Sequence, residues 1–129
     1  MSNTKYHILQ LDSLEDGVTL YVHLWPTKNA TGWVHIMHGM SEHGGRYDGL
    51  AKVLNSEGFN VSAGDHRGHG YTGKGVNTLG HLANQNGWNK VVVDQAEIIT
   101  HLQQQWSQPL TILGHSMGSF LATRVAQRY

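Results

Sequence analysis

The sequence predicts an α/β fold in which helices cover both faces of a mainly parallel sheet. Two patterns indicate this class. The chain begins with two strands joined by a tight turn, and after them short apolar runs alternate with amphipathic helical segments. Hydrophobic residues make up 39% of the 129 residues, which is enough to build a packed core. We therefore expect a single domain.

The N-terminal strands are predicted at residues 6–11 and 18–25. Asp16-Gly17 lies between them and is a favoured sequence for a hairpin turn. Apolar and polar residues alternate along the second strand, which is typical of an antiparallel strand with one buried face. The apolar positions are Val18, Leu20, Val22 and Leu24.

Two more strands and a helix follow. Residues 33–37 are mostly apolar without alternation, which indicates a strand covered on both faces, and residues 38–45 are a glycine-rich loop. Residues 59–63 are the next strand, and residues 65–75 contain so many glycines that we expect only a loop. Between these strands a helix presents Tyr47, Leu50, Ala51 and Leu54 on one face and ends at Gly58.

A long amphipathic helix, a strand and a final helix are predicted in the last third of the chain. The long helix has Asn86 or Asn89 as its N-cap. Pro109 closes the connection to a strand at residues 110–113, and the final helix covers residues 117–128. The apolar face of the long helix comprises Trp88, Val92, Gln95, Ile99, Leu102 and Trp106, and that of the final helix comprises Phe120, Leu121 and Val125.

Composition excludes several functional classes. Lys plus Arg equals Asp plus Glu, at 9 each, so we expect no partner that is a nucleic acid or an anionic membrane. Cysteine is absent, which excludes disulfides and thiolate zinc sites. No apolar run is long enough to cross a bilayer, and the first residues lack a signal-peptide pattern. We expect a cytoplasmic protein with no transmembrane segment, no metal and no cofactor.

The most informative motif is Gly114-His115-Ser116-Met117-Gly118. It is a G-x-S-x-G pentapeptide placed directly after a predicted strand and directly before a predicted helix. In that context a serine becomes an exposed nucleophile at a sharp strand-to-helix turn, and the two glycines remove side chains that would collide in the bend. We therefore interpret Ser116 as a catalytic nucleophile, which a base must activate.

Two backbone N–H groups are candidates for stabilising the negative oxygen that forms when such a serine attacks a carbonyl. Met117 follows the nucleophile and begins the next helix, so its N–H is the first donor. The second is the N–H of Met40, in the loop after the third strand. The residues expected to support these loops are His38, Gly39, Gly114, His115 and Gly118.

Three segments of the chain resemble monoacylglycerol lipases and lysophospholipases, a branch of the α/β-hydrolase fold that includes serine aminopeptidase-like members. Residues 38–47 (HGMSEHGGRY) resemble their oxyanion loop, residues 65–70 (DHRGHG) the segment after their fourth strand, and residues 114–119 (GHSMGS) their nucleophile elbow. The resemblance covers essentially the whole chain. It implies an esterase or lipase that acts on small-molecule acyl esters such as monoglycerides or lysophospholipids.

The resemblance also implies roles for individual residues. Ser116 is then the nucleophile, and Met40 and Met117 supply the oxyanion N–H groups. Thr72 departs from the pattern, because such relatives often carry serine there. Residues 1–129 resemble the N-terminal part of a single hydrolase domain, and the sequence ends one helix after the elbow. The residues implied to be scaffold are Arg46, Tyr47, Asp65, Arg67 and His69.

The segment after the elbow contains no Asp, Glu or His, although such a serine needs an acid and a histidine from later in the chain. We therefore expect the chain alone to be inactive or much impaired. The strand at residues 110–113 would also lack a neighbour on one side, which favours aggregation. Either the chain is part of a longer protein, or it needs a partner such as a second copy or a complementing C-terminal fragment.

Other interpretations stay open beside the hydrolase. A degenerate, non-catalytic hydrolase fragment could bind an acyl ligand or a protein partner. The ten histidines allow metal sites to be drawn from Asp65, His66 and His69, or from His38 and His43, but histidines that bond to loop backbone are favoured. His38 could also act as an improvised base for Ser116, although orienting its loop is the favoured role.

Overall fold

A computed structural model describes residues 4–13, 16–39, 42–75 and 87–129. Its strands are β1 (His7–Asp12), β2 (Thr19–Trp25), β3 (Gly32–Met37), β4 (Phe59–Gly64) and β5 (Leu110–Gly114). Its helices are α1 (Asp48–Ser56), α2 (Gly70–Gly75), α3 (Gly87–Leu102) and α4 (Met117–Arg128), and a 3-10 turn, η1, covers Gly44–Tyr47.

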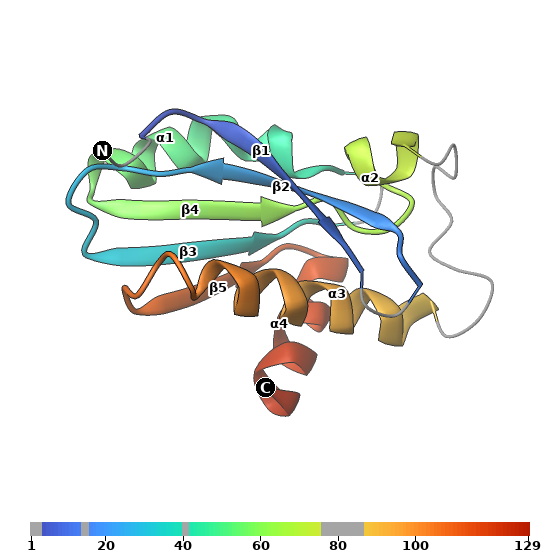
Figure 1. The fold of residues 1–129 in the computed structure, drawn as a ribbon. Coiled ribbons are helices and arrows are strands. Elements are labelled where there is room, and N and C mark those ends of the chain that lie inside the picture. The colour runs from blue at the N-terminus through green and yellow to red at the C-terminus, as the bar shows by residue number, and fades with distance from the viewer. Residues whose placement is uncertain (1–3, 14–15, 40–41, 76–86) are drawn as a thin grey trace.

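The five strands form one sheet in the order β1-β2-β4-β3-β5. Figure 1 shows α1 on one face of this sheet and α3 and α4 on the other. One apolar core lies between the sheet and α3 and α4, and a second lies under α1. The predicted α/β fold with helices on both faces is therefore confirmed.

The first two strands form the predicted antiparallel hairpin, with Gly17 at a positive φ of 73° in its turn. The prediction that β2 has only one buried face is wrong. His23 and Trp25, on the face opposite Leu20 and Val22, are also buried. This second face is covered by Tyr6, whose hydroxyl lies 2.7 Å from His23 Nδ1, and by the helix α1.

Strands β3, β4 and β5 make the parallel part of the sheet. All six residues of β3 are buried, as the unbroken apolar run predicts. Because the carboxyl ends of parallel strands lie at one edge of a sheet, the loops after β3, β4 and β5 gather there, and this edge is where ligands bind in open α/β sheets. In the described part of the chain β5 is an edge strand.

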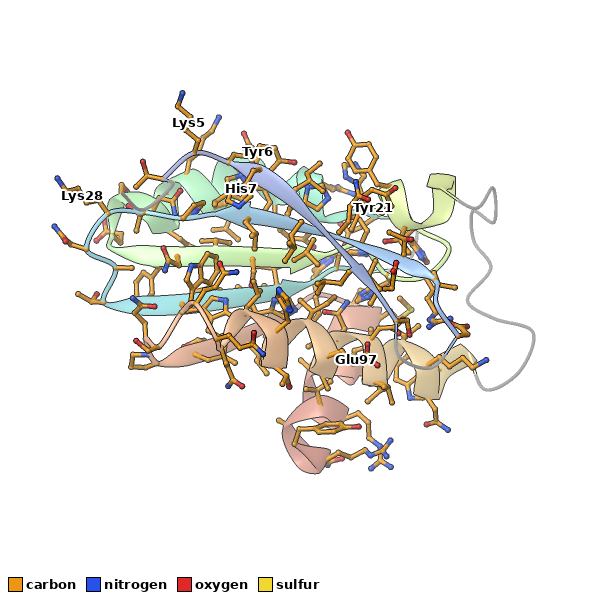
Figure 2. The ribbon with its side chains drawn as sticks, viewed as in Figure 1. Lys5, Tyr6, His7, Tyr21, Lys28 and Glu97 are labelled. Atoms are coloured by element: carbon orange, nitrogen blue, oxygen red, sulfur yellow. The ribbon has the colours of Figure 1, made fainter. Side chains whose placement is uncertain are left out.

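Side chains fill the layers on both sides of the sheet, whereas Lys5 and Lys28 point away from it (Figure 2). The larger core joins β2 and β3 to the two helices α3 and α4. Its fully covered members include Val22, Met37, Val92, Ile98, Leu102 and Leu121. None of the helices in the described ranges is long and apolar enough to cross a membrane.

Several helix boundaries and orientations differ from the prediction. Residues 70–75 form the short helix α2 instead of a loop. Asn89 lies inside α3 and is not its N-cap, while Asn86 lies outside the described residues. Trp106 follows α3 and packs edge-on against Trp33, with 5.6 Å between the ring centroids.

Two aromatic side chains expected on apolar helix faces are exposed. Phe120 on α4 is 70% exposed and Trp88 on α3 is 40% exposed. The helical spacing of apolar residues predicted that both side chains would face inward, but no other described element covers them. Leu121 and Val125, the other two residues predicted to face inward from α4, are buried.

Candidate active site

Ser116 lies at a strained turn between β5 and α4. Its backbone has φ 57° and ψ −118°, a conformation that residues with a side chain seldom adopt. A Cβ added to Gly118 would lie 1.8 Å from the carbonyl oxygen of Met37, and one added to Gly114 would lie 2.4 Å from the carbonyl oxygen of Gly118. Only glycine fits these two positions, because β5, α4 and the end of β3 are so close together.

Two polar groups at the turn have no hydrogen-bond partner among the described residues. The Ser116 side chain is exposed, and its Oγ forms no hydrogen bond with any residue that the structure describes. The N–H of Met117 begins α4, and within the described ranges it also has no hydrogen-bond partner, whereas the next two N–H groups bond to His115 and Ser116 at 2.9 Å. An unpaired N–H at the start of a helix favours a negative charge nearby.

The loop after β3 packs directly against this turn. A Cβ on Gly39 would lie 3.2 Å from Ser116 Cβ and 3.1 Å from the carbonyl oxygen of His115. Gly39 therefore lets the two loops touch. Met40, the predicted second oxyanion donor, lies outside the described residues.

Glu42 joins this loop to the turn. Its Oε1 accepts hydrogen bonds from the Gly39 N–H at 2.7 Å, the Tyr47 hydroxyl at 3.0 Å and His115 Nδ1 at 3.0 Å. Its Oε2 lies 3.1 Å from Arg46. Burial raises the pKa of Glu42, but the hydrogen bonds from His115, Gly39 and Tyr47 outweigh it and bring the pKa to about 2.

The linking role of Glu42 was missed in the sequence, although it lies inside the segment that carries the resemblance. The only local signal was Arg46 four residues later, a common spacing for an ion pair. His115, expected only as loop support, directs its Nδ1 to Glu42 instead of to Ser116.

His38 is buried and bonds to the loop backbone at both ring nitrogens. Its Nδ1 donates to the carbonyl oxygen of Gly39 at 2.7 Å, and its Nε2 accepts the N–H of His66 at 3.0 Å. Burial lowers the pKa of His38 to about 4, so the ring is neutral at pH 7. Both nitrogens are occupied, which supports orienting the loop over acting as a base for Ser116.

Asp65 ties the loop after β4 to the loop after β3. It accepts hydrogen bonds from the N–H groups of Gly44 at 2.7 Å and Tyr71 at 2.9 Å, and its Oδ1 lies 3.0 Å from His23 Nε2. Burial alone would raise the pKa of Asp65, but these partners lower it. A Cβ on Gly70 would lie 2.5 Å from this carboxylate, which explains the glycine there.

Arg67 also holds the loop after β4, through contacts with α3 and with the β1–β2 turn. Its buried guanidinium donates to Asp94 on α3 and to Asp16 and Ser13 at the β1–β2 turn. The Thr72 hydroxyl accepts the N–H of Tyr21 at 3.0 Å, a bond for which either threonine or serine has the oxygen. In the described part of the chain no group of three or more His, Cys, Asp or Glu side chains is arranged to hold a metal ion.

Comparison with known proteins finds relatives whose sequences match most of this chain. The chain is 32% identical over 113 residues to the monoglyceride lipase of Homo sapiens, and the match covers 86% of this chain and 35% of that protein. It is 31% identical over 115 residues to the monoacylglycerol lipase of Mycolicibacterium smegmatis, covering 88% of this chain and 39% of that protein. The chain thus spans little more than a third of the length of these relatives.

Solved structures of other proteins have the same fold as this chain. A thermostable carboxyl esterase from Bacillus coagulans superposes with a TM-score of 0.89 at 26% identity, covering 98% of this chain and 41% of the esterase. The family model described as serine aminopeptidase, S33 (Hydrolase_4) matches residues 28–129, the range that contains the loop after β3, the loop after β4 and the Ser116 turn. With this match over most of its length, the chain belongs to the Hydrolase_4 family and has the α/β-hydrolase fold.

Proposed function

We propose that Ser116 is the nucleophile of a hydrolase that cleaves carboxylic esters through an acyl-enzyme. One observation carries this proposal. An exposed hydroxyl stands at a strained turn beside the N–H of Met117, neither group has a hydrogen-bond partner among the described residues, and the Gly39 loop packs against the turn. Strain of this kind persists where the surrounding structure enforces it, and it is common at reactive serines of G-x-S-x-G turns.

The chemistry follows from these groups. Ser116 Oγ attacks the ester carbonyl carbon while a base accepts its proton, and the carbonyl oxygen becomes negative. The N–H of Met117, together with that of Met40 as proposed, donates to this oxygen. The intermediate collapses, the C–O bond to the alcohol breaks and the base returns the proton to the alcohol. Water then cleaves the acyl-enzyme by the same steps.

The base and its supporting acid are proposed to come from outside this chain. Among the described residues no imidazole or carboxylate bonds to Ser116. His38, which precedes Gly39, and His115, which precedes Ser116, are bonded elsewhere. Since triad groups act as a unit, we propose that the 129-residue chain alone turns over substrate poorly.

The proposed substrates are acyl glycerols or lysophospholipids. The names of the relatives support the first, because monoglyceride lipases match most of this chain. Thioesters and peptides are alternatives that the same turn could serve. The predicted cytoplasmic location remains a prediction.

We also propose that residues 1–129 are the N-terminal part of one hydrolase domain. Its remainder, or a second copy of the chain, would cover the edge of β5 that has no neighbouring strand in the described ranges. The partial coverage of the relatives supports this. The intact mass of the natural protein tests it: a mass well above that of 129 residues is expected, and a monomer of 129 residues would contradict it.

The function is tested by hydrolysis assays on the intact natural protein. We expect release of fatty acid from monoacylglycerol, with kcat falling at least about a thousandfold in Ser116→Ala. Ser107→Ala, in the exposed loop before β5, is the matched control and should leave kcat unchanged. Failure to cleave monoacylglycerol, lysophospholipid and thioester, together with binding of fatty acid, would favour the non-catalytic alternative.

A further inference from the structure

A chain of buried hydrogen bonds runs from the middle of the sheet to the loop beside Ser116. It passes through three histidines that the proposed chemistry does not use, and one glutamine on α3 joins two of them. All of its members are buried. In order, the members are Trp33, Ser62, His35, Gln95, His66, His38 and Gly39.

Two groups, one near each end of this series of hydrogen bonds, determine which atom donates in every bond between them. At one end Trp33 Nε1 can only donate, and it lies 2.8 Å from Ser62 Oγ. Toward the other end, the carbonyl oxygen of His38 can only accept, and His66 Nε2 lies 2.9 Å from it. His66 Nε2 must therefore carry the ring proton, and in the neutral ring His66 Nδ1 must accept.

Gln95 is placed so that only one orientation of its amide satisfies both neighbours. Its Nε2 lies 2.9 Å from His66 Nδ1, which accepts, and its Oε1 lies 2.8 Å from His35 Nε2, which must then donate. His35 Nδ1 is left to accept the Ser62 hydroxyl proton at 2.6 Å. A flipped amide would bring donor against donor or acceptor against acceptor at both contacts.

The last hydrogen bonds of this series hold the backbone of the loop that touches the Ser116 turn. His66 donates to the carbonyl oxygen of His38 through its ring and to His38 Nε2 through its backbone N–H. His38 Nδ1 then donates to the carbonyl oxygen of Gly39. Because Gly39 lacks a side chain to restrict its backbone, these bonds and the one from its N–H to Glu42 decide its conformation.

We propose that Gln95 is a positioning residue whose amide, held between His35 and His66, sets the histidine tautomers through which the sheet holds the His38–Gly39 backbone against the Ser116 turn. The importance of this loop for catalysis rests on the proposed function, but the hydrogen-bond chain does not. Burial also disfavours the charged form of these rings and lowers the pKa of His35 and of His38 to about 4, consistent with neutral tautomers.

Nitrogen-15 NMR of the histidine rings in the full chain tests the tautomers, because protonated and unprotonated ring nitrogens differ in chemical shift. At pH 7 we expect the proton on Nε2 in His35 and His66, and on Nδ1 in His38. A proton on Nδ1 of His66, or on Nε2 of His38, would overturn the proposal.

Two substitutions at Gln95 separate positioning from mere packing. In Gln95→Glu, the new carboxylate can accept from both neighbours, so His66 should hold protons on both ring nitrogens at pH 7 while His35 keeps its tautomer. In Gln95→Leu, both contacts are lost and His35 should lose its preference for one tautomer. Gln103→Leu, at an exposed position just after α3, is the matched control and should change none of the three rings.

Hydrogen exchange measures the effect on the loop without any need for activity. We expect Gln95→Leu to raise the exchange rate of the Gly39 amide about tenfold more than that of the Val61 amide in β4, a ratio that cancels global destabilisation. In Gln95→Glu, which keeps both contacts, most of this difference between the Gly39 and Val61 amides should be absent. Equal changes at Gly39 and Val61 would overturn the positioning role.

The reaction of Ser116 with a fluorophosphonate, followed in the same proteins, distinguishes this inference from the proposed function. A slower reaction in Gln95→Leu than in Gln103→Leu supports both. An inert Ser116 in the unsubstituted intact natural protein contradicts the proposed function, while the ring tautomers and the Gly39 exchange ratio still decide the role of Gln95. A reactive Ser116 that Gln95→Leu leaves unchanged overturns the inference and spares the function.

Discussion

The two sides of the His38–Gly39 loop are held by opposite kinds of interaction. On the inner side, the rings of His38 and His66 are buried, neutral and bonded to backbone groups. On the outer side, Glu42 is charged at pH 7 and accepts three hydrogen bonds near the surface, one of them from the exposed ring of His115.

This difference shows how burial determines whether neutral or charged groups hold the loop. A buried charge without full compensation is costly, so the inner side uses neutral groups, each of which must have its partner. On the outer side the Glu42 side chain is 10% exposed, but its partners Arg46 and His115 are 65% and 63% exposed, so solvent can replace either of them. We therefore expect the inner side to tolerate protonation and truncation poorly, and the outer side to tolerate them better.

The largest expected effect is that of acid on the inner side. The pKa of His35 and of His38 falls from 6.5 to about 4 on folding, so the unfolded chain takes up protons first as the pH drops. Stability is full above pH 6.5 and is lost between pH 6.5 and 4, by about 3 kcal/mol for each ring. His66, whose pKa is also lowered by burial, adds to the loss.

Urea unfolding at pH 7 and at pH 4.5 measures this loss. Glu42 sharpens the comparison, because its pKa of about 2 lies below its ordinary 4.5, so its contribution disappears only between pH 4.5 and 2. Equal unfolding free energies at pH 7 and 4.5 would contradict the neutral, buried state of the inner histidines.

The second largest effect is expected from Ser62→Ala. The substitution leaves the Nε1–H of Trp33 and Nδ1 of His35 buried without their shared partner. We expect the free energy of unfolding to fall by about 2–3 kcal/mol. Ser56→Ala removes a hydroxyl that bonds to a backbone carbonyl on the exposed end of α1, and as the control it should cost less than about 0.5 kcal/mol. Equal losses in the two variants would show that Trp33 and His35 do not depend on the Ser62 hydroxyl.

Glu42→Gln should have a smaller effect on the outer side. The amide oxygen can still accept from Gly39 and Tyr47, while the charge that holds His115 and Arg46 is lost. We expect a loss of about 1 kcal/mol in unfolding free energy at pH 7 and low salt, less at high salt. Glu57→Gln, at the exposed end of α1, controls for the change in net charge. A loss as large as that of Ser62→Ala would break the proposed difference.

Arg46→Gln is expected to have the smallest effect. The Arg46 side chain is 65% exposed and pairs with Glu42 four residues earlier. Exposed pairs of this spacing contribute about 0.3–0.5 kcal/mol, so the change in unfolding free energy should stay within that range. A larger loss, measured by urea unfolding at low salt, would show that the outer side depends on this pair.

The sequence predicted those features that depend on neighbours along the chain. The parallel strands followed from apolar runs, and the glycines of the Ser116 turn followed from the spacing of one pentapeptide. Contacts between distant segments could not be predicted in this way. Gln95 looked like one position on an amphipathic helix, yet it meets His35, 60 residues away. The exposure of Phe120 was missed for the same reason, because spacing does not say whether a partner covers a helix face.

The central claim is that the Ser116 hydroxyl is a reactive nucleophile at a strained turn. Its most direct test is to treat the intact natural protein with a fluorophosphonate and to locate the adduct by tandem mass spectrometry, with Ser116→Ala beside it. We predict one covalent adduct, on Ser116, and none in Ser116→Ala. An adduct on another serine, or a folded protein that gains no mass, would contradict the claim.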